Sequence, residues 1–157
     1  MEEHQARIIA HHTRVLSVVT SLQRLDEHEW RTPVKRGGWT VAEVIAHLIP
    51  WDDFVLQKRL PYLFSQHPLP KGPEREGINS RAAERGRCIA QRDIIAEFTN
   101  IRTDLLQSIR DIHETDWNRP IFIGETELTV SAYFIGLAEH DRHHLQEIRA
   151  VVRLPNR

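Results

Sequence analysis

Apolar residues recur at helical spacing in four stretches of the chain. Positions three and four apart lie on one face of an α-helix, so each stretch predicts an amphipathic helix that buries one side. Four such helices, joined by connections of unequal length, predict an all-α protein with the architecture of a four-helix bundle. The stretches cover about residues 3–25, 40–64, 91–112 and 130–152.

Local sequence signals set the ends of these helices. Thr40 followed by Glu43 matches the capping box that opens a helix, and Thr129 or Ser131 is suited to cap the fourth helix. Pro50 lies inside the second stretch. Because proline has no backbone N–H, we expect it to kink that helix or to break its hydrogen-bond ladder locally.

The connections between the helices differ in length. Residues 66–80 are rich in proline and glycine and predict a long loop between the second and third helices. Long loops in compact domains tend to be functional or mobile. Residues 116–128 contain alternating Ile121 and Ile123 beside Pro120 and Gly124, which predicts a loop or a minimal extended piece.

Length and composition narrow the class of protein. A chain of 157 residues with 40% hydrophobic residues is expected to form one domain over 1–157. The single cysteine, Cys88, excludes an internal disulfide and fits a reducing compartment. The first residues have no signal-peptide hydrophobic stretch, and no run has the length of a membrane span. We therefore expect a cytoplasmic protein.

The distribution of charge argues against polyanionic partners. The net charge is −1 with histidine neutral, so no overall field favours nucleic acid or an anionic membrane. Arginines between residues 75 and 92 alternate with acidic residues, which predicts a mixed, solvated surface rather than a phosphate-binding patch. We expect a small-molecule substrate and a homodimer, with no binding to nucleic acid or membrane.

Three histidines form a candidate metal site. His140 and His144 are four residues apart on the apolar side of the fourth predicted helix, where two imidazoles can ligate one metal ion. A buried polar ring costs stability unless something satisfies it, and a metal would do so. His47 lies on or next to the buried face of the second predicted helix, beside Leu48 and Trp51. Three imidazoles with open coordination positions are typical of a catalytic metal. Chance spacing, and a core histidine bonded to a carbonyl, remain the alternatives.

Other residues near this set have two interpretations each. Glu43 is expected to act in the capping box, with a weaker candidacy as a catalytic base or as a partner of His47 one turn away. Trp51 and Tyr133 could line a substrate pocket or could be ordinary core aromatics. Asp141 is expected on the solvated surface.

The remaining histidines are set aside. His11 is expected to be solvated, as are four more near segment ends or in loops. His12 and His143 neighbour more interesting positions but are rotated by roughly 100° from them on a helix.

Two phrases of the sequence resemble the DinB/YfiT-like family. They are Gly38–Leu48, with its Trp-Thr-x-x-Glu-x-x-x-His-Leu pattern, and His140–Ile148, with its His-x-x-x-His-x-Gln-x-Ile pattern. The resemblance implies a four-helix bundle with one divalent metal ion on His47, His140 and His144. Zinc or nickel is expected first, with iron or manganese as further options.

The resemblance also implies a choice of functions. The family includes S-transferases and isomerases that use low-molecular-weight thiols, and members described as metal-dependent hydrolases. It therefore implies an enzyme in which a metal-bound thiol or water attacks a small electrophile, and it favours a thiol cosubstrate. The alternative is a non-catalytic metal-binding module for stress response or dimerisation. Solvent access to the metal distinguishes the two, because a structural site is closed by a fourth protein ligand.

Overall fold

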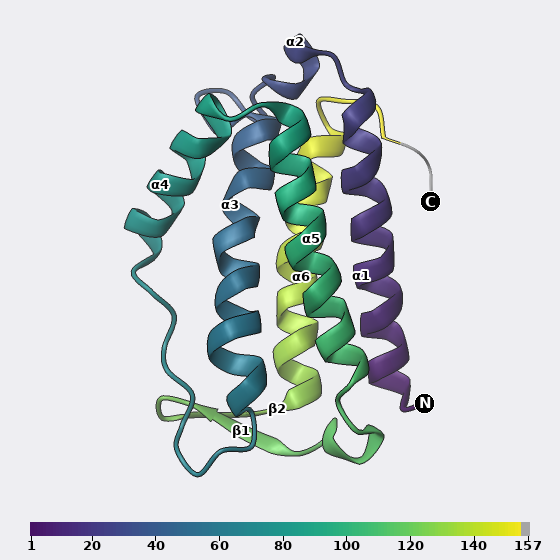
Figure 1. Ribbon diagram of the computed structural model, residues 1–157, viewed down its shortest axis with the longest axis vertical. Helices are drawn as coiled ribbons and strands as arrows, with labels where there is room; N and C mark the ends of the chain where they lie inside the picture. The colour runs from purple at the N-terminus through teal and green to yellow at the C-terminus, as the bar shows by residue number, and fades with distance from the viewer. Residues whose placement is uncertain (155–157) are drawn as a thin grey trace.

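Four long helices run side by side along the long axis of the molecule (Figure 1). The computed structural model describes residues 1–154. The long helices are α1 (Glu3–Ser21), α3 (Val41–Phe54), α5 (Gln91–Arg110) and α6 (Val130–Arg149). Shorter helices and turns are η1 (Leu22–Arg24), α2 (Glu27–Trp30), η2 (Val55–Arg59), η3 (Leu60–Tyr62), α4 (Arg75–Cys88) and η4 (Glu114–Asp116). Within residues 1–154, no helix has both the length and the apolar character needed to cross a membrane.

The predicted bundle is confirmed, and so are most of its helix boundaries. Thr40 and Glu43 form the full capping box at the start of α3. Thr129 caps α6 and accepts a hydrogen bond from the backbone of Ala132 at 3.1 Å. The helix runs past Pro50 to Phe54 and continues as the π-helical turn η2. Pro50 therefore does not end the helix, although proline removes one backbone donor there.

The long loop predicted over 66–80 extends too far at its C-terminal end. Its last residues belong to α4, an additional helix that lies on the outer face of α3 (Figure 1). The helix was missed because it is mostly polar and contains two glycines. Gly86 is in close contact with α3, since a Cβ there would lie 3.0 Å from the Cβ of Ala46. Packing against α3, rather than an apolar stripe, stabilises this helix.

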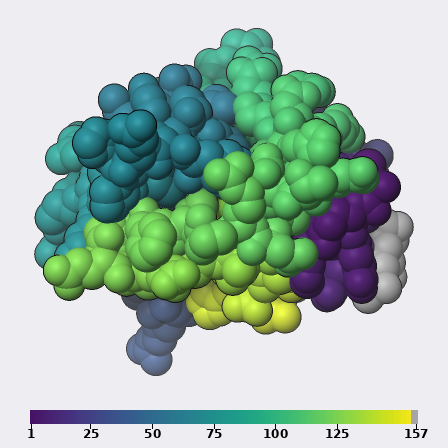
Figure 2. All heavy atoms as spheres, turned by 90° about the horizontal axis from the view of Figure 1, so that it is seen from below, coloured from purple at the N-terminus to yellow at the C-terminus, as the bar shows by residue number. Residues whose placement is uncertain are grey.

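A β-hairpin closes the lower end of the bundle. β1 (Pro120–Ile123) and β2 (Thr126–Thr129) pair antiparallel, and Gly124 adopts a positive φ of 57° in the turn. Leu69 bridges to Ile123, which ties the segment before α4 to the hairpin. Figure 2, seen from below, shows the hairpin and the chain that follows α3 covering this end. The extended piece predicted near residues 116–128 is this hairpin.

Two apolar clusters fill the bundle, one towards each end. On α1, α3, α5 and α6 the upper cluster includes Val15, Ile49, Phe98 and Leu145. The lower cluster includes Ile8, Leu105 and Ala138 on α1, α5 and α6, and Val55 at the start of η2. Between the two clusters, every long helix contributes buried polar side chains. We call this group the polar layer; it consists of His11, His12, Asp52, Arg102 and Asp141.

Arg102 lies at the centre of the polar layer. It donates to Asp52 at 2.6 and 3.0 Å and to Asp141 at 2.8 and 3.1 Å, and it contacts the Nδ1 atom of His12 at 3.4 Å. All five guanidinium N–H groups therefore have an acceptor. His11 adds a further contact to Asp141 at 2.8 Å.

The burial of His11 and Asp141 corrects the expectation that both are solvated. Burial alone would raise the pKa of Asp141, but attraction to Arg102 and hydrogen bonds from His11 and Arg102 hold it below its usual range. Burial also raises the pKa of Asp52 to about 6, against the opposing effect of Arg102. The spacing within one helix could not reveal these partners, because they lie on other helices.

Replacing Arg102 should destabilise the whole bundle. In Arg102→Met two buried carboxylates lose their charge partner, so we expect the free energy of unfolding to fall by about 3–5 kcal/mol. The measurement is chemical denaturation at pH 7. Arg85→Met is the control, since it breaks an exposed ion pair to Glu97 and should cost less than about 1 kcal/mol. Equal, small losses in both variants would contradict the role given to Arg102.

Candidate metal centre

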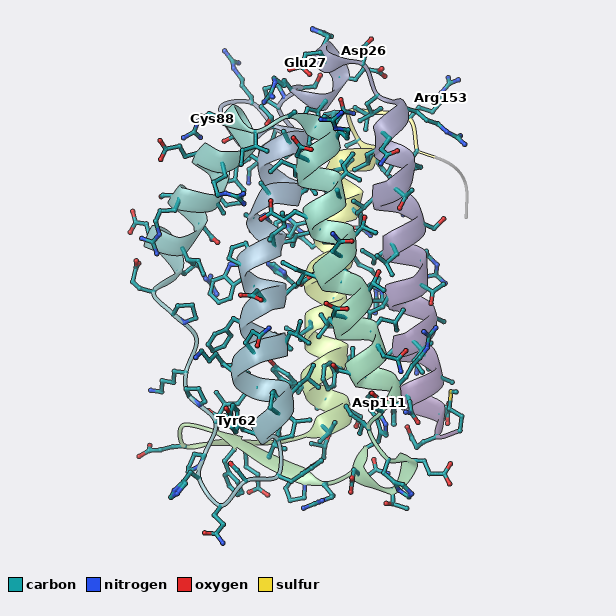
Figure 3. The ribbon with its side chains drawn as sticks, viewed as in Figure 1. Asp26, Glu27, Tyr62, Cys88, Asp111 and Arg153 are labelled. Atoms are coloured by element: carbon teal, nitrogen blue, oxygen red, sulfur yellow. The ribbon has the colours of Figure 1, made fainter. Side chains whose placement is uncertain are left out.

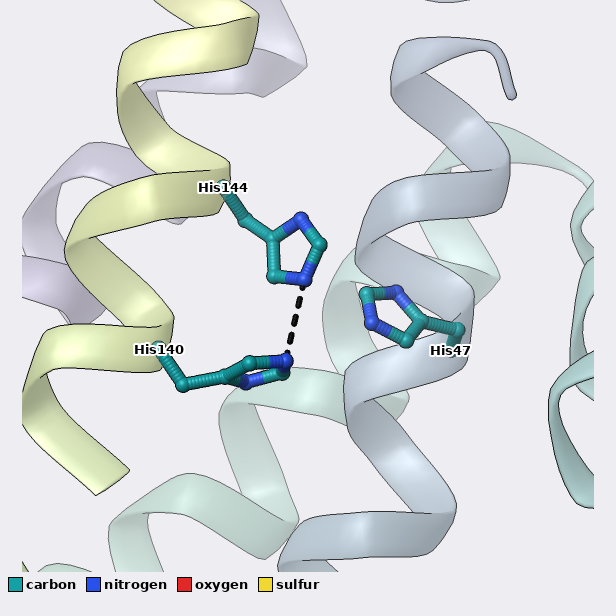
Figure 4. Close-up of side chains that lie close together, drawn as sticks. All are labelled: His47, His140 and His144. Carbon is teal, nitrogen blue, oxygen red and sulfur yellow. Dashed lines mark hydrogen bonds between the residues drawn. The ribbon is translucent and has the colours of Figure 1, made fainter. Parts of the chain in front are cut away.

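Three histidines from two facing helices meet on one side of the bundle. His47 projects from α3 towards His140 and His144 on α6 (Figure 4). One nitrogen of each ring lies within 4.8 Å of the others. The Nε2 atoms of His140 and His144 are 3.2 Å apart. The structure therefore brings together the three residues that the sequence predicted as ligands, while metal binding itself stays a prediction.

Hydrogen bonds orient two of the three rings. The Nδ1–H of His47 donates to the backbone carbonyl of Val44, and the Nδ1–H of His144 donates to the carboxylate of Glu147 at 2.8 Å. With Nδ1 used in this way, each ring directs Nε2 and its lone pair at the shared space. Metal-binding histidines typically have such a partner on the second nitrogen.

The protonation of the rings also suits a cation. Burial lowers the pKa of His47 to about 4, and the neighbouring His144 acts in the same direction. Burial and His144 likewise lower the pKa of His140. These two rings are therefore neutral near pH 7 and can offer a lone pair.

The donor set fits a divalent metal ion. Two nitrogens bound tetrahedrally at about 2.1 Å from one ion lie about 3.4 Å apart, close to the separation of the Nε2 atoms on α6. Among the His, Cys, Asp and Glu side chains of residues 1–154, these three histidines are close enough together to share one ion, and no fourth residue belongs to the group. Such a set leaves coordination positions open.

The helical phase of α6 differs from the prediction by about one position. The buried seam runs through Phe134, Ala138, Asp141, Leu145 and Ile148, spaced by three and four residues. The two ligand candidates on α6 therefore lie on the flank of the seam, where one ring is exposed and the other half-buried. Only His47 is truly buried, at 2% exposure. The expectation that both rings on α6 are buried in the core is therefore wrong, although both lie close to His47 as predicted.

A cavity of about 430 Å³ lies over the triad and contacts all three rings. We call it the triad pocket. Its volume is within the range of pockets that hold small ligands. The indole ring of Trp39 packs beside His47, with ring centres 4.7 Å apart and ring planes tilted by 47°. The other lining residues are His12, Leu48, Trp51, Asp52, Phe54, Val55, Arg59, Arg75, Asn79, Arg102, Leu105, Leu137 and Asp141.

Of the other candidate residues, Trp51 lines the triad pocket, whereas Tyr133 and Glu43 do not. Trp51 lines the pocket, and its Nε1–H donates to Asn79 at 2.7 Å. Tyr133 is buried and accepts a hydrogen bond at 3.0 Å from Arg59, which does line the pocket. Glu43 acts in the capping box, and its second carboxylate oxygen accepts from Arg87 at 3.0 Å. The cap interpretation of Glu43 is therefore confirmed, and its carboxylate is not free to act as a base.

Two other features lie away from the open side of the triad. A larger cavity of about 540 Å³ is lined by Lys35, Glu43 and Arg87 among others, and of the three histidines it reaches only His144. The triad pocket is the better candidate active site because it contacts the whole set. Cys88 is exposed at the end of α4, at the upper end of the molecule (Figure 3).

Several pocket residues were missed from the sequence. Arg75 and Asn79 belong to the unexpected helix α4, and Arg59 belongs to the π-helical turn after α3. His12 was set aside, yet it is 1% exposed and lines the pocket, with an Nε2 atom that has no hydrogen-bond partner. Burial and Arg102 lower the pKa of His12 to about 3. A helical stripe of residues 8, 12, 15 and 19 would have placed His12 in the core.

Comparison with protein families gives one match that covers most of the chain. The family described as the DinB superfamily matches residues 7–148. Among curated proteins, no sequence matches this chain.

Solved structures that share the fold include two described proteins. One is YfiT from Bacillus subtilis, described as a probable metal-dependent hydrolase with an unusual four-helix bundle topology. It has a TM-score of 0.78 and 16% identity, over 98% of this chain and 88% of that one. The other is a mycothiol-dependent maleylpyruvate isomerase, with a TM-score of 0.64 and 15% identity, over 97% of this chain. This chain spans 62% of the isomerase. At such identities the likeness shows the fold alone.

Neighbouring histidines on α6 should differ sharply in their effect on metal content. His144→Ala removes a ring aimed at the triad and should abolish or strongly weaken binding. His143→Ala removes a ring that is 67% exposed and should leave about one metal ion per chain. Elemental analysis of protein purified without a nickel column measures both. Equal losses would show that the assigned helical phase is wrong.

Proposed function

Because the chain belongs to the DinB superfamily, we propose that its histidine triad holds one divalent metal ion and serves a metal-dependent enzyme. We propose that a low-molecular-weight thiol is added to a small electrophile in the triad pocket. Hydrolysis, with water in place of the thiol, is the second reaction that the same pocket supports.

The open pocket over the triad is the observation that carries this proposal. A structural metal site is closed by four protein ligands, whereas a catalytic site keeps a position for water or substrate. Here three imidazoles adjoin a cavity of about 430 Å³. The nearest carboxylates in the pocket wall, Asp52 and Asp141, are both bonded to Arg102 and are not free to close the shell.

The residues of the chain have distinct parts in such a reaction. His47, His140 and His144 would hold the ion, which lowers the pKa of a bound thiol or water and polarises an acceptor oxygen. Val44 and Glu147 fix the rings of His47 and His144 through their Nδ1 atoms. Trp39 and Trp51 provide apolar walls that exclude water from the reacting groups.

The finer assignments rest on the family and on composition. Imidazole ligands suit several divalent metals, and zinc or nickel is proposed ahead of iron or manganese. The thiol is favoured because one solved structure with this fold is a mycothiol-dependent isomerase, while another is described as a probable metal-dependent hydrolase. We further propose a cytoplasmic homodimer with a small-molecule substrate, which binds neither nucleic acid nor membrane.

A non-catalytic metal-binding module for stress response or dimerisation is the competing function. It requires a metal that organises the bundle and exchanges no ligand. The exposed ring of His140 and the adjoining pocket count against a closed shell.

A thiol should bind at the triad and react there. Adding 2-mercaptoethanol to the cobalt-substituted protein should produce a sulfur-to-metal absorption band near neutral pH, since three neutral ligands leave the cation uncompensated. Thiol conjugation to a panel of small electrophiles should then be lost in His140→Ala.

A Cys88→Ser background is the control for this experiment, because the exposed cysteine could itself react with an electrophile. Cys88→Ser should keep both the absorption band and the activity. A spectrum that the thiol does not alter, from a cobalt ion with no exchangeable water ligand, would contradict the enzymatic proposal and favour the structural module.

A further inference from the structure

The charges around the triad pocket do not cancel. Its two carboxylates, Asp52 and Asp141, share the buried guanidinium of Arg102. Two further arginines, Arg59 and Arg75, line the same cavity. Within residues 1–154 neither of them forms an ion pair with a carboxylate. The lining therefore holds three arginines against two carboxylates, which leaves one positive charge in excess even before a metal ion is added.

Arg59 is held in a fixed position. It belongs to the π-helical turn after α3, and its guanidinium lies over the rings of Phe54 and Tyr133 at 4.9 and 5.4 Å. It donates to the hydroxyl of Tyr133 and to the carbonyl of Pro70, both at 3.0 Å. Its Nε–H is buried without a partner. A cation anchored by neutral acceptors and aromatic faces keeps its charge available to a ligand.

Arg75 approaches the pocket from α4. It is the first residue of that helix and is exposed, and Asn79 one turn later also lines the pocket. The neighbouring Glu74 forms no ion pair with it; that carboxylate accepts hydrogen bonds from the backbone N–H groups of Glu76 and Gly77 at the start of the helix. Arg75 and His140 line the same cavity.

Apart from the histidines and Asn79, the rest of the wall is apolar. Trp39, Trp51 and Phe54 provide flat faces, and Leu105 and Leu137 contribute aliphatic surface. An occupant of this cavity therefore needs an apolar body and at least one negative charge. A carboxylate matches the fork of an arginine side chain, which can donate two parallel hydrogen bonds to it.

We propose that the triad pocket selects an electrophile that carries a carboxylate on an apolar, unsaturated or aromatic body, and that Arg59 and Arg75 bind this carboxylate. That the occupant is an electrophile rests on the proposed function, whereas the recognition of its carboxylate is independent of metal and of catalysis. The two can therefore fail separately.

Equilibrium binding of a matched, unreactive pair tests the proposal. The probes are phenylacetate and phenylacetamide, which are of similar shape and differ in charge, and the measurement is isothermal titration calorimetry at constant ionic strength. Metal-free and zinc-loaded protein are both titrated, because a carboxylate could also bind the metal. We expect phenylacetate to bind at least about tenfold more tightly than the amide in both forms.

Three variants assign the preference to the arginines. Arg75→Met and Arg59→Met should each weaken phenylacetate binding by about fivefold or more, and should change the affinity for the amide by less than about twofold. Arg81→Met, on the same helix as Arg75 but outside the pocket, is the matched control and should change neither. Since the Arg59 side chain also packs on two rings, unchanged amide binding shows that the pocket remains folded.

Several outcomes would overturn the proposal. They are equal affinity for the two probes, no detectable binding of phenylacetate at millimolar concentration, and a preference for the carboxylate that appears only with zinc and survives both arginine changes. The last result would place the carboxylate on the metal.

A final arm separates an anionic electrophile from an anionic thiol. 2-Mercaptoethanol, a neutral thiol, is titrated into cobalt-substituted protein with and without saturating phenylacetate. If the carboxylate belongs to the electrophile, both molecules bind together and the sulfur absorption band is retained in Arg75→Met. Competition between them would overturn the assignment to the electrophile.

Discussion

The guanidinium of Arg102 joins the four long helices at one level of the bundle. It extends from α5 to a carboxylate on α3 and another on α6, and it contacts a histidine on α1. Buried charges are stable only when their partners are in place, so this contact fixes how each helix is rotated and how far it is shifted along its axis. Asp141 directly follows His140, and Asp52 lies five residues after His47. The arrangement of the polar layer therefore also determines where the ligand candidates meet.

The same layer explains why the triad can be open. Apolar clusters above and below it supply the stability of the core, and the polar residues between them leave a cavity on the side of α3 and α6. Because Arg102 holds both buried carboxylates, neither is free to complete a metal shell. The buried ion-pair network thus leaves the coordination position open, while Arg59 and Arg75 supply the positive charge of the pocket.

What the sequence could predict was local. The capping box at Thr40 and the four-residue spacing of His140 and His144 depend on neighbours within one or two turns, and both are present in the structure. The partners of Asp141 lie on α5 and α1, so its burial could not be read from α6 alone. Helix α4 was missed for a related reason: Gly86, which suggests a break in an isolated sequence, permits close packing on α3. Without that helix, Arg75 could not be placed in the pocket.

X-ray absorption spectroscopy of the zinc-loaded protein tests the central claim most directly, because it reports the ligands of the ion itself. We predict three imidazole nitrogen ligands at about 2.0–2.1 Å and one exchangeable oxygen ligand, which sulfur replaces when a thiol is added. In His47→Ala the imidazole number should fall. A shell of four protein ligands that a thiol does not alter, or a spectrum unchanged in His47→Ala, would contradict the claim that this triad is an open metal site.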